Sequence, residues 1–588
     1  MNQNLESLGH VLQTDVAVLG CGLSGLWASI KARDYVEDVL IMDKGPMNWG
    51  GLGSFCGGDM IVWDPNEDIM KWIDDLVFYF EGLIEQDIIE DLLRKSYDRF
   101  LDYEAMGHRF ARDGDGNLIR VNQRGLDHVS SILSRPFGTG GESLVSSLVK
   151  KANQLNVRRL SRIQITNIVK DNDRVAAVTG FHTRSGEFYI IKTKALILCT
   201  GNSSWKPSYC INTCTGEGFE LALEVGVRLR NFEFIKVWNV PKDFAWEGQT
   251  MLLPLGARFV NALGEDFMKK YSPMLGAKMD PHYNTRAMAE EYLAGRGPVY
   301  LDTTAMRRED VKLLTPTGGW MGLNYARLKE MGLDLFKDKT EWIPQVNYNI
   351  GGVDTDTSSQ SNISGIFAAG RARSLEPGVY LGGWAVSTTA TTGAIAGENA
   401  GKMAASLAHQ PRTDCALIAK IKHDTLSPLT RPGLVPKEVL NEIREVISPY
   451  DVSILKSEKG LTRAYNRIKE IQEELIPRMG ADSPHYLMKA NEVRSIATVT
   501  ELYLQASLRR KETRAGHHRV EYPSRDEKYL GWFLVSKDQG KLEWTLRRVQ
   551  VEDYKIKPYR FYGDLFKPQE KAPNRPEIED RGQSCPTS

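Results

Sequence analysis

A glycine-rich turn near the N-terminus carries the residues best suited to bind a nucleotide. Gly20, Gly22 and Gly25 follow a short apolar run, and a second apolar run ends at Asp43. Gly20 permits a tight turn, Gly22 lets the backbone approach a pyrophosphate, and Gly25 lets a helix pack against a strand. The N–H groups at the helix N-terminus attract phosphate, and Asp43 is placed to accept from ribose hydroxyls. These residues predict a dinucleotide site.

The elements that must position this site are a strand, a helix and a second strand. Residues 16–19 and 39–42 are short apolar runs typical of buried parallel strands. Between them, apolar side chains in residues 23–32 recur at helical spacing. The whole βαβ unit in register is a more specific signal than the glycines, whose alternative interpretation is a turn in some other α/β unit.

The turn does not distinguish FAD from NAD, but later stretches do so by resemblance. Residues 194–201 and 365–370 resemble the returning and late strands of two-dinucleotide flavoproteins. Thr215-Gly216-Glu217-Gly218, followed by Glu233-Phe234, resembles a run of the flavoprotein subunits of fumarate reductase, succinate dehydrogenase and adenylylsulfate reductase. Residues 347–352 and 510–517 extend this resemblance, which covers the chain from about Thr14 to about Pro523.

The resemblance implies an α/β fold with a Rossmann-like FAD-binding domain in two segments, 1–246 and 345–410. An inserted capping domain spans 247–344, a helical domain follows at 411–515, and a C-terminal region with a flexible tail spans 516–588. The stretch 248–268 is most similar to adenylylsulfate reductase, which indicates that branch of the family.

The resemblance also implies the residues that contact FAD. A histidine that family members bond covalently to flavin aligns with Gly51, so we expect non-covalent FAD. Arg371 replaces an acid after Ala-Ala-Gly and either stabilises the reduced flavin or points outward. The expected FAD contacts are Gly20, Gly22, Ser24, Gly25, Asp43, Lys44, Gly50, Gly51, Gly57, Gly58, Thr200, Gly201, Thr215, Gly216, Glu217, Gly370, Arg371 and Val386.

The substrate side departs from the family pattern. Trp238 and Asn347 stand where the resemblance places histidines, and Tyr380 stands where it places an arginine. A dianion in a dry pocket needs cations, so these changes argue against succinate or fumarate. An aromatic-lined pocket suits a flatter or less charged molecule, although Trp238 and Tyr380 could equally be core residues.

Arg286 is the position where this chain keeps the family's proton-delivering arginine. Glu290 follows four residues later, so one helix places the two side by side. We expect Arg286 either to relay a proton recharged by Glu290 or to form an ordinary ion pair on a solvated helix.

Composition excludes several classes of protein. The 588 residues include 75 basic and 75 acidic residues, which gives no charge excess for nucleic acid. The sequence has neither an apolar stretch of membrane-spanning length nor an export signal, so we expect a cytoplasmic protein. Its seven cysteines are scattered, so any iron–sulfur cluster belongs to another chain.

Two hypotheses about function follow. In the first, the chain is an FAD-dependent oxidoreductase that exchanges electrons between an iron–sulfur or ferredoxin-like partner and a small organic substrate that is not a C4 dicarboxylate. In the second, it is an electron-transfer or scaffold flavoprotein subunit without substrate chemistry. An adenylylsulfate reductase-like enzyme is a further alternative. Arg286, Tyr380, Trp238 and Asn347 are the candidate catalytic residues of the first.

Overall fold

The computed structural model describes residues 4–47, 51–135, 140–206, 214–244, 252–306, 320–430 and 432–566. The expected cofactor residue Gly50 lies outside these ranges. The expected junction between the first FAD-binding segment and the cap, at 246–247, also lies outside them, as does the expected tail from residue 567 onward.

The main sheet has seven strands among the described residues, and it confirms the predicted βαβ unit. β1 pairs in parallel with β2 on one side and with β11 on the other. β11 was expected as two elements, the end of a β-meander and a separate returning strand, but it is one continuous strand. Its first half pairs with β10 and its last three residues pair with β19. The strands, in sheet order, are β8 (Arg158–Ser161), β2 (Val39–Asp43), β1 (His10–Leu19), β11 (Phe188–Leu198), β10 (Arg174–His182) and β9 (Ile163–Asp171), with β19 (Ile366–Ala368) beside β11.

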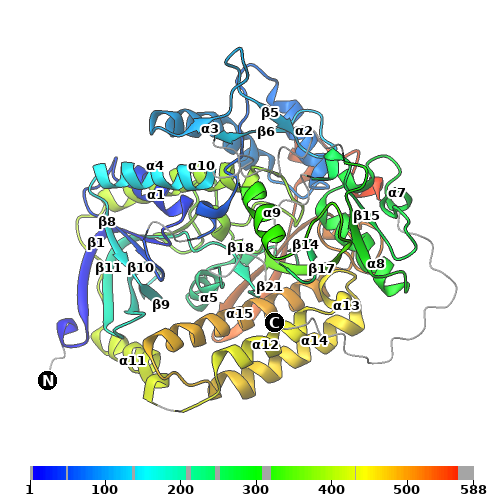
Figure 1. The fold of residues 1–588 in the computed structure, drawn as a ribbon. Coiled ribbons are helices and arrows are strands. Elements are labelled where there is room, and N and C mark those ends of the chain that lie inside the picture. Colours follow the sequence, from blue (N-terminus) through cyan, green and yellow to red (C-terminus); the bar gives the residue numbers. More distant parts are fainter. Residues whose placement is uncertain are drawn as a thin grey trace.

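Helices cover both faces of this sheet (Figure 1). Apolar residues of α1, α3, α4 and α10 form one buried cluster with Val18 and Ile41, and those of α5 and α15 form another with Leu19 and Leu40. α1 and α10 approach closely because α10 carries small residues at the contact; a side chain at Gly397 would come within 2.2 Å of the carbonyl oxygen of Ala28. These helices are α1 (Leu23–Ala32), α3 (Gln86–Ala105), α4 (Gly140–Gln154), α5 (Glu217–Glu224), α10 (Trp384–Ala405) and α15 (Pro484–Arg509).

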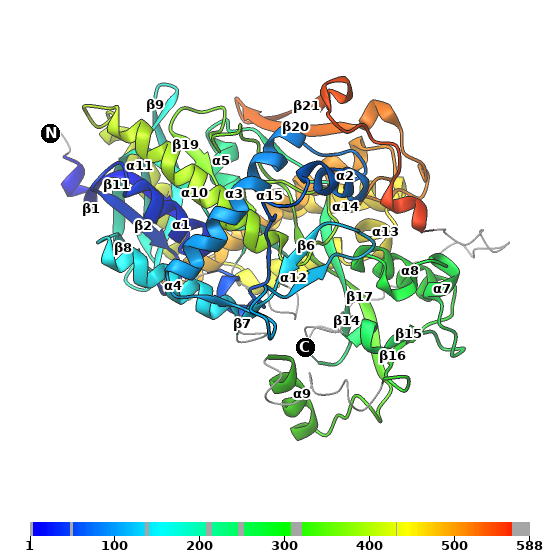
Figure 2. The same cartoon turned by 90° about the horizontal axis from the view of Figure 1, so that it is seen from above.

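A second sheet forms the expected cap. β14 and β17 pair antiparallel over most of their length and extend the cap away from the main sheet (Figure 2). α8 packs against both strands. The strands are β12 (Ser203–Ser204), β17 (Thr340–Asn349), β16 (Val299–Asp302) and β15 (Arg258–Val260), with β14 (Ile235–Pro241) on β17, and the helices are α7 (Met268–Tyr271), α8 (Pro281–Leu293) and α9 (Trp320–Glu330).

The helical region follows the predicted pattern. Leu461 and Ile468 of α14 share a buried cluster with residues of α12 and α15. The periodic pattern predicted one helix over 461–476, but α14 ends at Glu470 and continues as a π-helical turn. The helices of this region are α11 (Cys415–Leu426), α12 (Pro436–Ile447), α13 (Tyr450–Ser453), α14 (Glu458–Glu470) and α15.

The C-terminal region is joined to the FAD-binding part by a third sheet. β20 (Gly531–Asp538) pairs with β21 (Lys541–Arg548) and with β13 (Leu229–Arg230), which in turn pairs with β18 (Gly352–Val353). Smaller sheets join β3 (Met60–Ile61), β6 (Ser130–Ile132) and β5 (Arg120–Asn122), and β4 (Arg109–Phe110) with β7 (Ser134–Arg135); α2 (Ile69–Tyr79) precedes α3. Within the described residues, no helix combines the length and apolar character needed to cross a membrane.

Candidate functional site

The predicted glycine turn has the geometry of a phosphate cradle. Gly20 has a φ of +101°, which side chains rarely adopt, and a Cβ there would lie 2.3 Å from the carbonyl oxygen of Cys199. A Cβ at Gly25 would lie 1.8 Å from the carbonyl oxygen of Gly20. Gly22 precedes α1, and no side chain caps the helix at that position. The N-terminus of α1 therefore keeps backbone donors available for a phosphate.

Asp43 ends β2 at the same edge of the sheet. Its carboxylate accepts hydrogen bonds from the backbone N–H of Cys21 (2.8 Å) and of Gly45 (2.8 Å). These bonds tie the acid to the glycine turn and hold it where a ribose hydroxyl is expected.

Other expected cofactor residues gather around this turn. A Cβ at Gly51 would lie 3.6 Å from the Cα of Gly22, and a Cβ at Gly370 would lie 2.7 Å from Oγ of Ser24. Thr200 and Gly201 follow β11, Gly57 and Gly58 precede β3, and Val386 is buried in the first turn of α10. Loops from β1, β2, β11 and β19 thus converge at the carboxyl ends of parallel strands, where α/β sheets bind ligands.

A buried charge cluster joins the cofactor side to the helical region. Lys44 donates to Thr215 (2.6 Å), to Glu217 and to Glu492 of α15 (2.8 Å). Burial opposes its charge, but the two carboxylates outweigh burial and hold the pKa of Lys44 above its usual value. Glu492 also binds Lys206 and Lys489. Burial alone would raise the pKa of Glu492, yet the three lysines hold it well below the usual range.

Trp238 and Tyr380 come together on the substrate side. Their ring centroids are 4.9 Å apart and their planes meet at 69°, an edge-to-face contact. Trp238 lies on β14, and the backbone N–H of Tyr380 donates to Asp280 (2.7 Å) at the start of α8. Trp238 is only partly buried, so the pair borders the space beneath the cap and leaves part of the indole accessible.

Lys236 is a site residue that sequence reasoning missed. It precedes Trp238 by two positions on β14, and its Nζ lies 5.5 Å from the Tyr380 ring centroid. The ammonium donates to the carbonyl oxygens of Gly378 (3.4 Å) and Val379, and lies 3.7 Å from the carboxylate of Glu376. A lysine inside an otherwise apolar strand was the signal that could have found it.

Arg371 points inward, not to the surface. Its guanidinium donates to Glu376 (2.8 Å) and lies over the ring of Tyr348 (5.8 Å). Burial opposes the charge, but Glu376 outweighs it and raises the pKa of Arg371. Arg371 and Lys236 therefore share one carboxylate.

Asn347 and His282 bring unpaired polar atoms to this region. Both amide atoms of Asn347 and Nδ1 of His282 are buried and have no hydrogen-bond partner among the described residues. Burial, together with the nearby Lys456, Arg286 and Lys236, lowers the pKa of His282 to about 3. A neutral imidazole and an amide are groups that a ligand can satisfy, since buried polar atoms without partners are costly.

Arg286 lies on α8 as expected, but the helix is not solvated there. Its side chain is 7% exposed, its Nε is 3.6 Å from Glu290, and its guanidinium lies over the ring of Phe566 at 4.6 Å. Burial lowers the pKa of Arg286, with Glu290 opposing. The pairing with Glu290 is present, in a buried setting next to the C-terminal region.

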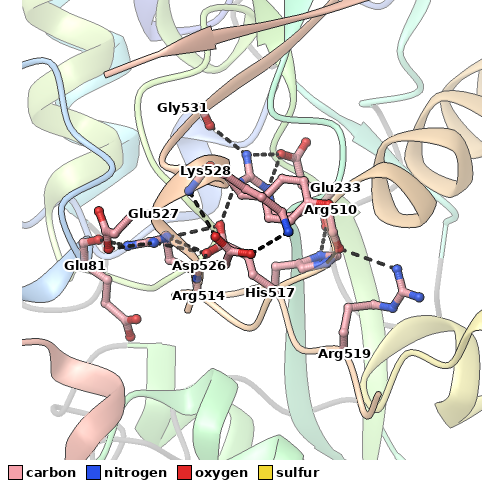
Figure 3. Close-up of polar contacts among 12 residues, drawn as sticks. Glu81, Glu233, Arg510, Arg514, His517, Arg519, Asp526, Glu527, Lys528 and Gly531 are labelled. Carbon is pink, nitrogen blue, oxygen red and sulfur yellow. Dashed lines mark hydrogen bonds and ion pairs between the residues drawn. The ribbon is translucent and has the colours of Figure 1, made fainter. Parts of the chain in front are cut away.

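The stretch 510–517 forms a buried network behind the pocket (Figure 3). Arg510 binds Glu233 (2.7 Å) and Glu512 (2.8 Å). His517 donates from Nε2 to the carbonyl oxygen of Arg510 (3.2 Å), so its Nδ1 accepts from Lys456 (2.9 Å). Burial is the main cause that lowers the pKa of both Lys456 and His517. Because Lys456 also binds the carbonyl oxygen of Glu233 (2.8 Å), the network supports the start of β14.

Comparison with known proteins gives this geometry a family. A model of the FAD binding domain matches residues 15–384, and a model of the fumarate reductase flavoprotein C-terminus matches residues 441–562. The chain belongs to the fumarate reductase flavoprotein family. It is an FAD-dependent oxidoreductase.

Relatives and solved structures extend over nearly the whole chain. It is 26% identical over 557 residues to an uncharacterized FAD-dependent oxidoreductase of Methanocaldococcus jannaschii, covering 91% of this chain and 97% of that protein. It is 24% identical to a subunit of the CoM/CoB fumarate reductase of Methanothermobacter marburgensis, covering 87% and 95%. Its fold is similar to E. coli quinol fumarate reductase (TM-score 0.83, 21% identity, 94% and 99% covered) and to adenylylsulfate reductase of Archaeoglobus fulgidus (TM-score 0.76, 20%, 93% and 97%).

The residues present fit FAD. The uncapped α1 N-terminus would hold the pyrophosphate, Asp43 the ribose, and the close approach of Gly51 and Gly370 to the turn leaves backbone rather than side chains beside the cofactor. FAD would supply hydride chemistry at this site, and the protein supplies orientation and electrostatics.

Proposed function

We propose that this chain is the flavoprotein subunit of an oxidoreductase whose organic substrate is not a C4 dicarboxylate. The observation that carries the proposal is the contact between Trp238 and Tyr380, at positions where the family resemblance places cationic anchors. Neither ring offers a charge to a carboxylate, and Asn347 offers a neutral amide at the third position. An uncharged or singly charged planar molecule can pack against exposed parts of the rings and hydrogen-bond the amide.

Fumarate provides the direct test of this proposal. The holoenzyme is photoreduced without oxygen, mixed with fumarate, and followed by flavin absorbance. We expect no reoxidation by fumarate, whereas an artificial quinone dye restores the oxidised spectrum. Reoxidation by fumarate at enzymatic rates, about 1 to 1,000 per second, would contradict the proposal.

The electron partner follows from what the sequence lacks. No second glycine-rich turn precedes a helix, so we infer an iron–sulfur or ferredoxin-like protein in place of NAD(P)H. Relatives named as subunits support assembly with another chain. A reduced ferredoxin should reduce the flavin quickly, and NADH or NADPH should not; rapid reduction by either nucleotide would remove the reason for a protein donor.

The FAD should be non-covalent because Gly51 offers no nucleophilic side chain to the flavin. Acid precipitation of the yellow protein should leave the flavin in the supernatant. Flavin that stays with the precipitated chain would contradict this assignment.

A second candidate is a subunit that carries electrons without substrate chemistry. It is favoured by the direct contact of Trp238 with Tyr380, because the rings fill space that anchors would otherwise border. The same stopped-flow assay separates the two: reoxidation by some small organic acceptor supports the enzyme, and reoxidation only by electron-transfer proteins and dyes supports the carrier.

A further inference from the structure

We propose that Lys236, Glu376 and Glu85 form a proton line from solvent to the pocket beneath the cap, with Lys236 Nζ as its inner end. The line lies in the described residues between β14, the loop before α10, and the start of α3. Its inner end rests on the proposed function, since a proton is delivered there only if a substrate is reduced in that pocket.

The inner end is a buried ammonium beside the aromatic pair. Lys236 is 4% exposed, and its three protons are directed at two carbonyl oxygens and at Glu376. Burial lowers the pKa of Lys236, with Glu376 and Asp280 opposing and Arg371 reinforcing the effect. Lys236 also contributes to the lowered pKa of His282. A buried lysine is a stronger acid than an exposed one, and far stronger than an arginine.

The middle of the line is Glu376. It is 4% exposed and pairs with both Arg371 (2.8 Å) and Lys236 (3.7 Å). Burial raises its pKa, but these two cations outweigh burial and leave it below the usual value. When Lys236 gives up its proton, Glu376 loses one of its two cations. Its pKa then rises, so Glu376 accepts a proton at the moment Lys236 needs one.

The outer part is a small cavity that touches both acids. Its lining includes Glu376, Glu85, Arg230 and Asn231, and it has room for about one water molecule. Nε of Arg230 and Oδ1 of Asn231 are buried without a hydrogen-bond partner among the described residues. These are the polar atoms that a bound water requires.

Glu85 connects the cavity to solvent. Its side chain is 19% exposed and pairs with buried Arg230 (2.7 Å) and with Arg547 (3.3 Å), which is 38% exposed. Burial raises the pKa of Glu85, but Arg230, Arg547 and Arg373 outweigh burial and lower it. The line therefore runs from an exposed ion pair, through one water, to a buried carboxylate and a buried ammonium.

The step balances as follows. Lys236 breaks one Nζ–H bond and gives that proton to the substrate atom that gains electron density. The other hydrogen and both electrons come from the reduced cofactor as hydride, so the substrate is reduced and the cofactor oxidised. Neutral Lys236 takes a proton from Glu376, and Glu376 takes one from the cavity water, which solvent recharges through Glu85.

The test counts protons in holoenzyme without any substrate. Reducing the flavin adds negative charge beside Lys236 and raises its pKa, so a neutral Lys236 takes up a proton. The midpoint potential of bound FAD is measured from about pH 6 to 11, a range that spans the ordinary lysine pKa. We expect wild type to show a pH segment in which one additional proton accompanies the two electrons, and Lys236→Gln to lack it.

Three other variants locate the line. Lys242→Gln removes an exposed lysine just after β14, 37% exposed and paired with Glu341, and should keep the segment. Glu376→Gln should move it to lower pH, because Lys236 loses its carboxylate. Glu85→Gln should keep it but slow proton uptake severalfold when reduction is followed with a pH-indicator dye.

The outcomes separate this proposal from the proposed function. Equal proton counts in wild type and Lys236→Gln at every pH, with FAD bound in both, would overturn the line and leave the proposed function intact. If Lys236→Gln does not hold FAD, the shift in Glu376→Gln and the uptake rate in Glu85→Gln decide; no change in either overturns the line. Reoxidation by fumarate, in contrast, overturns the proposed function alone.

Discussion

The cofactor side and the substrate side of this molecule are built in different ways. At the cofactor side, backbone makes the site, and Gly20 and Gly25 are required because carbonyl oxygens stand where a side chain would be. At the substrate side, side chains make the site, and Trp238, Tyr380 and Lys236 meet from separate segments. A backbone site tolerates few residue types, whereas a side-chain site can change its specificity by substitution.

The largest difference between the two sides should appear on adding bulk to the glycine turn. Gly25→Val places side-chain atoms within 1.8 Å of the carbonyl oxygen of Gly20. We expect the variant to lose most bound FAD, because α1 can no longer pack on β1. The ratio of flavin to protein absorbance measures this. Gly114→Val is the matched control, since nothing lies within 4 Å of a Cβ there; full FAD content in Gly25→Val would contradict the cradle.

The next largest effect concerns the charges that hold the cofactor side to the helical region. Glu492→Gln leaves Lys44, Lys206 and Lys489 without their shared carboxylate. Removing one partner of a buried ion pair costs about 3–5 kcal/mol, so we expect a large drop in the thermal midpoint at pH 7. Glu473→Gln, on an exposed residue, should change it little.

This effect has a defined pH dependence. The pKa of Glu492 is lower in the folded chain than its reference of 4.5. Its stabilisation is therefore complete above about pH 4.5 and is lost as pH falls toward the folded-state pKa. The difference between wild type and Glu492→Gln should shrink below that pH. A difference that stays constant or grows on acidification would show that Glu492 is not the ionised partner of the lysines.

On the substrate side, Arg286 competes with Lys236 as proton donor. If Arg286 relays protons with Glu290, Arg286→Lys should keep FAD but lose well over tenfold in turnover with an acceptor that reoxidises the wild-type flavin, because proton-transfer catalysis contributes about a hundredfold or more. Flavin reduction by the donor should stay normal. Arg463→Lys, an exposed arginine, is the control. Unchanged turnover would leave Arg286 as a packing partner of Phe566.

The smallest effect should come from the aromatic pair. Trp238→Leu removes an edge-to-face contact worth about 0.5–1.5 kcal/mol beyond buried area. We expect normal FAD content and a small decrease in the denaturant midpoint, unlike Gly25→Val. Tyr486→Leu, on an exposed ring, gives the baseline. Loss of FAD in Trp238→Leu would mean that this residue belongs to the cofactor side.

Much of the fold was predictable because its signals are local. The first βαβ unit, α2 and α3, and α15 follow from apolar periodicity and turn residues within short windows. The continuous β11 was harder, because pairing with β10 and β19 on the same edge decides where that strand ends. The break in α14 at Glu470 likewise has no local signal in the pattern that predicted one helix.

The sequence by itself determined the cofactor turn, because the turn's requirements concern single residues at fixed spacing. It also marked Trp238, Tyr380 and Asn347 as departures from the family pattern. Only the tertiary structure decided that Trp238 meets Tyr380, that Arg371 and Lys236 share Glu376, and that Glu492 neutralises Lys44. Lys44 and Glu492 are 448 residues apart in the chain. Charge pairs of this kind form between segments brought together by burial, and no local sequence pattern encodes which segments those are.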